Sequence, residues 1–78
     1  MERLKQLAIS EEGFIFDPVT GNSFTTNGTG LFILEALKEG REEKEIVDLL
    51  TEEYGIDKES ASRDLMDFME QLRSYRLI

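Results

Sequence analysis

The sequence predicts an α+β fold in which three strands come first and three helices follow. Two observations support this order. Apolar and polar residues alternate with the period of a β-strand before Asn27, and after it apolar residues recur at the three- and four-residue spacing of helices. A chain of 78 residues is expected to form one core, so residues 1–78 are interpreted as a single domain.

Three short segments before Asn27 are expected to be the strands. The first is Leu7 to Ser10. The second is Phe14 to Asp17, in which both phenylalanines lie on one face and Ile15 lies on the other. The third runs from Asn22 to Thr26. The alternative is that these segments are loops around a helical bundle.

The segment DPVTG, between the second and third strands, has the composition of a tight turn. Pro18 presets its own φ, and Gly21 can take the positive φ that closes a bulged hairpin. The second and third strands are therefore expected to be neighbours in the sheet.

Three helices are expected after the strands. Asn27 can cap the first helix, because its side-chain oxygen can accept a hydrogen bond from a free amide of the first turn, and Gly40 can end it. The second helix extends roughly from Glu42 to Tyr54 and ends at Gly55, and Asp57 can cap the third. The residues expected on the core-facing sides of the three helices are Leu31, Ile33, Leu34, Leu37, Ile46, Leu49, Leu50, Tyr54, Ala61, Leu65, Phe68, Leu72 and Tyr75.

The sequence lacks the residues that most enzymes use at neutral pH. It contains no histidine and no cysteine, which removes the usual acid/base, a common nucleophile and the common zinc ligands. The segment GNSFTTNGTG does not have the spacing or the lysine of a phosphate loop, and the paired glutamates do not have the spacing of a calcium loop. The chain is therefore expected not to be an enzyme and to hold no cofactor and no metal ion.

The formal net charge of −8 opposes binding to phosphate backbones and to anionic lipid surfaces. No apolar segment has the length of a signal peptide or a membrane span, so a cytoplasmic protein with no membrane partner is expected. The tight turn between the second and third helices makes a winged-helix DNA-binding regulator an alternative. However, Arg41 to Glu53 carries two positive and six negative residues, which disfavours nucleic acid as a partner.

An unprotected strand and a methionine-bearing side of the third helix together suggest a binding site. The third strand, Asn22 to Thr26, contains no charge and no proline, so nothing in its sequence protects it if it lies at the edge of the sheet. Such an edge can accept an added strand. One flank of the third helix carries Met66 and Met69 between Ser62 and Arg73, and methionines adapt to varied partners. The alternatives are a covered strand and methionines that only pack at the periphery of the core.

From about Leu7 to Ile78 the chain resembles the PqqD-like peptide chaperones, which contain the recognition element of ribosomally made, modified peptides (the RiPP recognition element). The resemblance is carried by GFIFDPVTGNSFTTN, NGTGLFILEAL with Gly40, EIVDLLTEEYGID and RDLMDFMEQLRSYRLI. The opening GFIFDPVTG is most similar to the subgroup associated with an HPr-related kinase. The resemblance implies a winged-helix-like fold with a three-stranded antiparallel sheet followed by three helices.

The resemblance also implies a function in peptide modification. In that family the leader segment of a precursor peptide adds as a strand to the third strand, beside the third helix, here Lys58 to Tyr75. The domain presents the leader to a modifying enzyme, often a radical iron–sulfur enzyme, and does no chemistry itself. This chain departs from the family at Thr26, where a leucine is common.

The expected partners are thus a precursor peptide and a modifying enzyme. An adaptor that docks on an enzyme through the outward residues Glu45, Asp48 and Glu52 of its acidic second helix is a further alternative. The residues expected to bind the peptide are Asn22, Ser23, Phe24, Thr25, Thr26, Met66, Met69 and Arg73.

Overall fold

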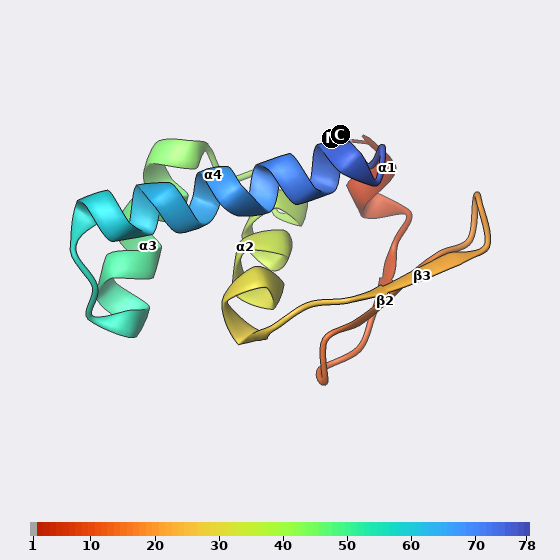
Figure 1. Ribbon diagram of the computed structural model, residues 1–78, viewed down its shortest axis with the longest axis horizontal. Coiled ribbons are helices and arrows are strands. Elements are labelled where there is room, and N and C mark those ends of the chain that lie inside the picture. Colours follow the sequence, from red (N-terminus) through yellow and green to blue (C-terminus); the bar gives the residue numbers. More distant parts are fainter. Residues whose placement is uncertain (1) are drawn as a thin grey trace.

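The computed structural model describes residues 2–78 and confirms three strands followed by three long helices, with one short helix in front of them. Figure 1 shows the sheet and α1 at one end of the long axis, α3 at the other end and α2 between them, with α4 running along the top from α3 towards α1. In the described part of the chain, no helix is long and apolar enough to cross a membrane. The elements are α1 (Glu2–Lys5), β1 (Ala8–Ile9), β2 (Phe14–Asp17), β3 (Asn22–Thr25), α2 (Gly28–Lys38), α3 (Glu43–Tyr54) and α4 (Lys58–Ser74).

The sheet is antiparallel, with the strand order β1-β2-β3, so β3 lies at an edge. Ile15 pairs with Phe24 across β2 and β3, and both side chains face the helices. The other face of the sheet is open, because Phe14 is 61% exposed and Phe16 is 46% exposed. Gly21 has the positive φ of 78° that the predicted turn requires.

The helix ends follow the predicted signals closely. The side chain of Asn27 accepts a hydrogen bond of 2.8 Å from the amide of Gly30, and Gly55 ends α3 in the left-handed conformation, with φ of 63°. Asp57 occupies the position before α4, but its side chain makes no capping hydrogen bond. The sequence signals thus gave the helix boundaries even where the expected hydrogen bond is absent.

The core lies between the inner face of the sheet and the three long helices. Four residues that the helical spacing assigned to the core are only partly buried or exposed, namely Leu31, Leu49, Tyr54 and Tyr75, whereas Met69 is 5% exposed and belongs to it. The buried apolar residues are Leu4, Leu7, Ile15, Ile33, Leu34, Ala36, Leu37, Ile46, Leu50, Ala61, Leu65, Phe68, Met69, Leu72 and Leu77.

A buried carboxylate fixes the turn between β2 and β3 to the N-terminal helix. Asp17 is 1% exposed, and both of its oxygens accept hydrogen bonds from the Arg3 guanidinium, at 2.5 and 3.1 Å. The amide of Val19 and the hydroxyl of Thr20 donate to the same carboxylate at 3.0 Å. The bonds from Arg3 lower the pKa of Asp17 to about 2 against the opposing effect of burial, and those from Thr20 and Val19 add to the lowering.

This pair predicts a specific loss of stability in acid. The pKa of Asp17 is lower in the folded chain than its ordinary value of 3.8, so the bonds stabilise the fold fully above about pH 4 and lose their effect as the pH falls towards about 2. The replacement Asp17→Asn is expected to lower the melting temperature at pH 7 and to flatten its dependence on pH between these limits. Thermal unfolding of both proteins over this range checks the prediction. Equal pH dependence in both would contradict it.

Candidate functional site

The outer edge of β3 offers unpaired main-chain groups in the described chain. The amide of Thr26 donates to the carbonyl of Gly13 at 2.9 Å, which fixes which residues of β3 face β2. Because residues of an antiparallel pair alternate, Phe24 points its N–H and C=O at β2, whereas Ser23 and Thr25 point theirs away from the sheet. These outward groups form a template for one further strand.

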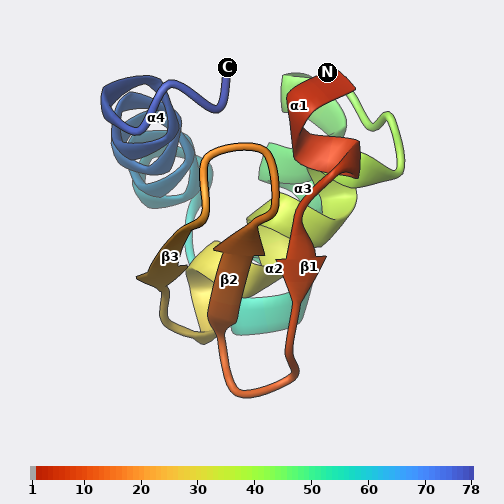
Figure 2. The ribbon, with the colours of Figure 1, turned by 90° about the vertical axis from the view of Figure 1, so that its right-hand side faces the viewer.

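Helix α4 passes beside this edge, and we call the surface formed by β3, the start of α2 and the facing flank of α4 the leader groove. Figure 2 shows β3 at the side of the sheet nearest to α4. The rings of Phe24 and Tyr75 are stacked, with centroids 4.2 Å apart and planes at 29°. Tyr75 is 45% exposed, so this aromatic pair joins the strand to the C-terminal end of α4 and still presents surface to solvent. An apolar side chain of a bound peptide could pack against it.

The groove deepens at the C-terminal end of β3. There the start of α2 and one flank of α4 enclose a hollow of about 200 Å³ with both polar and apolar walls. Phe68 forms the apolar part on α4. The residues that line the hollow are Asn27, Thr29, Gly30, Ile33, Asp64, Asp67, Phe68 and Gln71.

The floor of this hollow depends on a close approach between two small residues. A Cβ built on Gly30 would lie 1.9 Å from Oγ1 of Thr26 and 3.0 Å from the Phe68 ring. Thr26 therefore packs against the backbone of α2, and only glycine leaves room for it.

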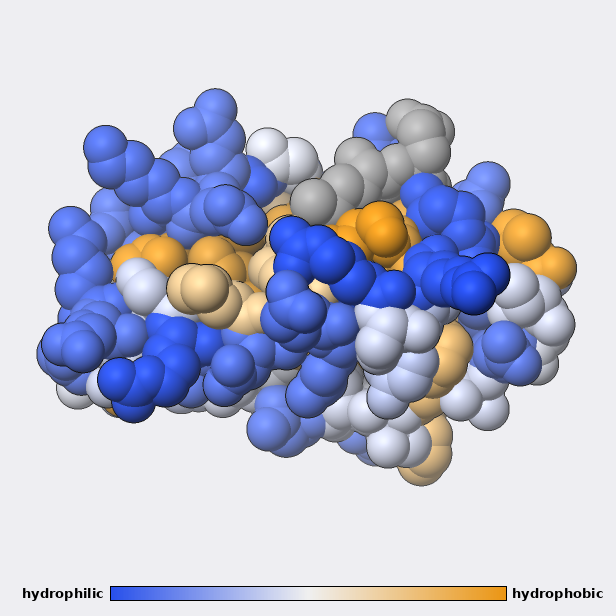
Figure 3. Space-filling view, turned by 45° about the horizontal axis from the view of Figure 1, so that its top comes forward, coloured by the Kyte–Doolittle hydropathy of each residue, from blue (hydrophilic) through white to orange (hydrophobic). Residues whose placement is uncertain are grey.

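The structure does not bring the three predicted residues of α4 to this groove. Met66 is 67% exposed and lines a separate hollow with Lys44 and Val47 of α3. Met69 is buried in the core, and Arg73 donates to Glu70 at 2.7 Å on the exposed surface. Figure 3, in which the upper side of the molecule comes forward, shows a mostly hydrophilic surface interrupted by small hydrophobic areas, one of them at the end where α3 and α4 lie.

The spacing of apolar residues could not predict which side of α4 faces the groove, because this depends on the path of the whole chain. A buried stripe has two flanks. The flank with Asp64, Asp67 and Gln71 faces the start of α2, just beyond the end of β3, although its polarity suggested a solvated surface. The five predicted residues of the third strand, Asn22 to Thr26, do lie together along the open edge and its continuation. Tyr75 was missed as a groove residue because it ends the apolar stripe and was assigned to the core.

The described side chains of the groove are carboxylates, amides, hydroxyls and apolar groups. Among residues 2–78 no cluster of three or more carboxylates is placed to hold a metal ion. Asp64 and Asp67 offer negative charge, Gln71 and Asn27 offer amides, and the open edge of β3 offers main-chain hydrogen bonds. These groups are suited to holding an extended chain.

Comparisons with known proteins agree with this geometry. Residues 12–78 match the family described as Coenzyme PQQ synthesis protein D (PqqD). A solved structure described as TbiB1 in complex with the TbiA(beta) leader peptide is similar with a TM-score of 0.81 and 32% identity, and the match covers 91% of this chain and 84% of that chain. A structure described as lasso peptide synthetase B1 complexed with the leader peptide shares the fold, with a TM-score of 0.76 and 24% identity over 88% of this chain and 82% of that chain. No curated protein matches the sequence significantly.

Proposed function

Because the chain belongs to the PqqD family, we propose that it captures the leader segment of a ribosomally made precursor peptide and presents it to a modifying enzyme. The similar structure with 32% identity is a complex with a leader peptide, which supports this class of ligand. The observation that carries the proposal is the open edge of β3 beside α4. Residues 1–78 would act as one peptide-binding domain, and membership in the HPr-related kinase subgroup stays a prediction.

The leader would bind as a fourth strand. Its main chain would pair with the outward N–H and C=O groups of Ser23 and Thr25, which gives affinity without demanding a particular sequence. Side chains on the inner side of the added strand would meet Phe24 and Tyr75, and farther along they would meet Phe68. The leader is therefore expected to carry apolar side chains at alternate positions along the paired segment.

The negative charge of the groove also predicts which leader residues can bind at the end of β3. Asp64 and Asp67 face the hollow at the end of β3, and none of the described residues that line it is positively charged. A leader residue that reaches this end is expected to be a hydrogen-bond donor or a cation, because a carboxylate there would be repelled. Met66 and Arg73 are not part of the proposed site, because Met66 lines a hollow beside α3 and Arg73 donates a hydrogen bond to Glu70.

The protein itself would be non-catalytic. The sequence contains no histidine and no cysteine, and the described residues that line the hollow are two carboxylates, two amides, one threonine and apolar residues. The modifying enzyme would supply the chemistry, and this domain would supply an ordered peptide. Ordering a flexible leader costs free energy, so affinity is expected to be moderate for the area of contact.

Calorimetric titration with the synthetic leader of the precursor encoded beside the gene tests the proposal. We expect Tyr75→Ala to weaken binding about tenfold, because it removes half of the aromatic pair, and Met66→Ala to change it by less than about twofold. If Met66→Ala weakened leader binding more than Tyr75→Ala, the result would indicate that the leader binds at the flank of α4 that carries Met66, as the sequence suggested. Steep, salt-sensitive affinity for duplex DNA without affinity for the leader would instead support a DNA-binding regulator.

A further inference from the structure

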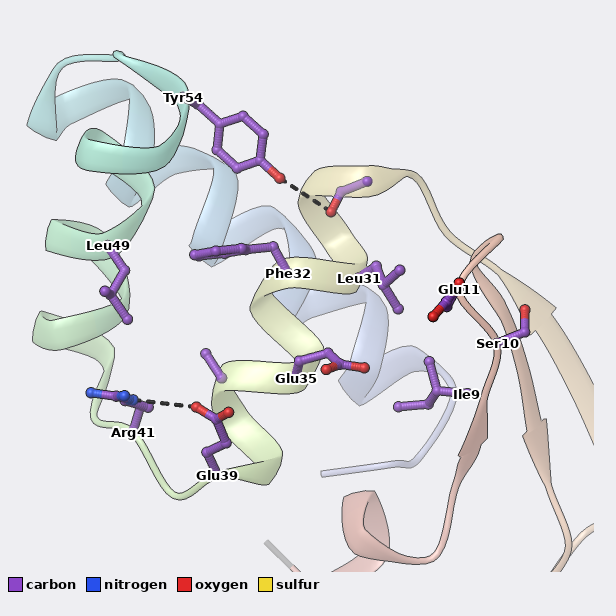
Figure 4. A pocket seen from close by; sticks show the side chains of 12 residues that line it. Ile9, Ser10, Glu11, Leu31, Phe32, Glu35, Glu39, Arg41, Leu49 and Tyr54 are labelled. Carbon is purple, nitrogen blue, oxygen red and sulfur yellow. Dashed lines mark hydrogen bonds and ion pairs between the residues drawn. The ribbon is translucent and has the colours of Figure 1, made fainter.

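A second and larger hollow lies on the other side of the molecule from the leader groove. It has a volume of about 640 Å³ and is bounded by β1, α2 and α3 (Figure 4). We call it the β1–α3 hollow. Its apolar wall is formed by Ile9, Leu31, Phe32, Leu49 and Tyr54.

The apolar wall includes residues that the sequence predicted to be buried in the core but that remain partly exposed. The helical spacing assigns Leu31 and Leu49 to the core, yet both are only partly buried and line the hollow from α2 and α3. A domain of this size has little apolar surface to spare, so leaving two leucines partly exposed is costly unless something covers them.

Two specific contacts join α2 and α3 at one end of the apolar wall. The rings of Phe32 and Tyr54 meet edge to face with centroids 5.7 Å apart, and the hydroxyl of Tyr54 donates to the carbonyl of Gly28 at 3.3 Å. These contacts join the end of α3 to the start of α2 across the top of the hollow (Figure 4). The hollow is thus a defined feature of the packing between α2 and α3.

The rim of the hollow is acidic. Glu11, Glu35 and Glu39 surround the apolar wall, and Arg41 is the one cationic residue in the lining. Arg41 already pairs with Glu39 at 3.4 Å and with Glu45 at 3.5 Å. Glu11 and Glu35 form no ion pair with any described residue, so the rim keeps an excess of negative charge.

The two binding surfaces can be occupied at the same time. The β1–α3 hollow borders β1, and the leader groove borders β3, at the opposite edge of the sheet. The first turn of α2 separates them, because Gly28 and Leu31 line one and Thr29 and Gly30 line the other. A ligand in one therefore leaves the other accessible.

We propose that the modifying enzyme docks at the β1–α3 hollow through a segment that presents a large apolar side chain beside a lysine or arginine. The inference rests on the proposed function, since a protein that presents a leader must hold its enzyme elsewhere. The apolar wall accepts the large side chain, and Glu11 and Glu35 pair with the cation. A second copy of this chain fits poorly, because it would bring another net charge of −8 to an acidic rim.

The test compares two double charge reversals in the full-length protein. Binding to the purified modifying enzyme encoded beside the gene, with leader present, is measured for Glu11→Lys/Glu35→Lys and for the matched control Glu52→Lys/Glu53→Lys on the exposed side of α3. We expect the rim variant to bind the enzyme at least about tenfold more weakly, and the control to stay within about threefold. Leu49→Ala should also weaken docking, since it removes part of the apolar wall.

Three results would overturn the inference. They are no enzyme binding by the wild type, an equal or larger loss for the Glu52→Lys/Glu53→Lys control, and wild-type dimers in sedimentation that the rim variant dissociates. Leader affinity is measured for every variant and is expected to stay within about twofold of the wild type. Failure of the wild type to bind leader would refute the proposed function, whereas a docking failure with leader binding intact would refute the inference alone.

Discussion

The replacement Thr25→Pro should abolish most of the leader affinity while leaving the fold intact. Proline has no N–H, and the N–H of Thr25 points away from β2 towards the position of the added strand. Its ring would also crowd the approaching chain. Loss of one hydrogen bond together with this crowding predicts a weakening of at least about tenfold, or about 1.4 kcal/mol. Calorimetric titration with the synthetic leader measures it.

Two controls test whether Thr25→Pro acts by preventing strand pairing and not by disturbing the fold or the side chain. Thr25→Val keeps the N–H and the branched shape, so it should bind leader within about twofold of the wild type. The melting temperature of Thr25→Pro should stay close to that of the wild type, because proline is tolerated in an edge strand where its missing N–H faces solvent. A folded Thr25→Pro protein with undiminished affinity would contradict strand addition at this position.

The replacement Gly13→Ala should cause a large loss of stability. Gly13 has φ of 94°, and a Cβ there would lie 2.3 Å from the carbonyl oxygen of Thr26. That oxygen belongs to the backbone, so relief requires a shift of β3 against β2. Strain and clash together predict a loss of about 3 kcal/mol in the free energy of unfolding. Chemical denaturation of both proteins measures it.

The matched control is Gly21→Ala. Gly21 also has a positive φ, of 78°, but nothing lies within 4 Å of the added Cβ. Only the backbone penalty applies there, so a loss of about 1 kcal/mol is expected. Equal losses at the two glycines would mean that the contact between Gly13 and Thr26 does not limit the position of β3.

The sequence was most informative where local chemistry decides the structure. Asn27, Gly21 and Gly55 act through their own backbone and nearest neighbours, and each lies where its local signal placed it. The three strands follow from alternation, which directly reflects the pleat. The third strand does lie at an edge, and its lack of charge and proline leaves that edge unprotected.

The sequence was least informative where distant segments meet. The pairing of Arg3 with Asp17 joins α1 to β2, and neither residue has a local pattern that predicts it. The two flanks of α4 are equivalent in helical spacing, so only the path of the chain decides that Asp67, and not Met66, faces the start of α2 next to β3. The partial exposure of Leu31 likewise depends on how α2 and α3 diverge.

Hydrogen exchange of single amides in β3, with and without leader, tests the central claim most directly. In the free protein the amides of Ser23 and Thr25 should exchange quickly, because they point away from the sheet, whereas those of Phe24 and Thr26 should be protected by β2. Saturation with leader is expected to slow exchange at Ser23 and Thr25 selectively. Unchanged, fast exchange at both amides in the saturated complex would contradict pairing of the leader with β3.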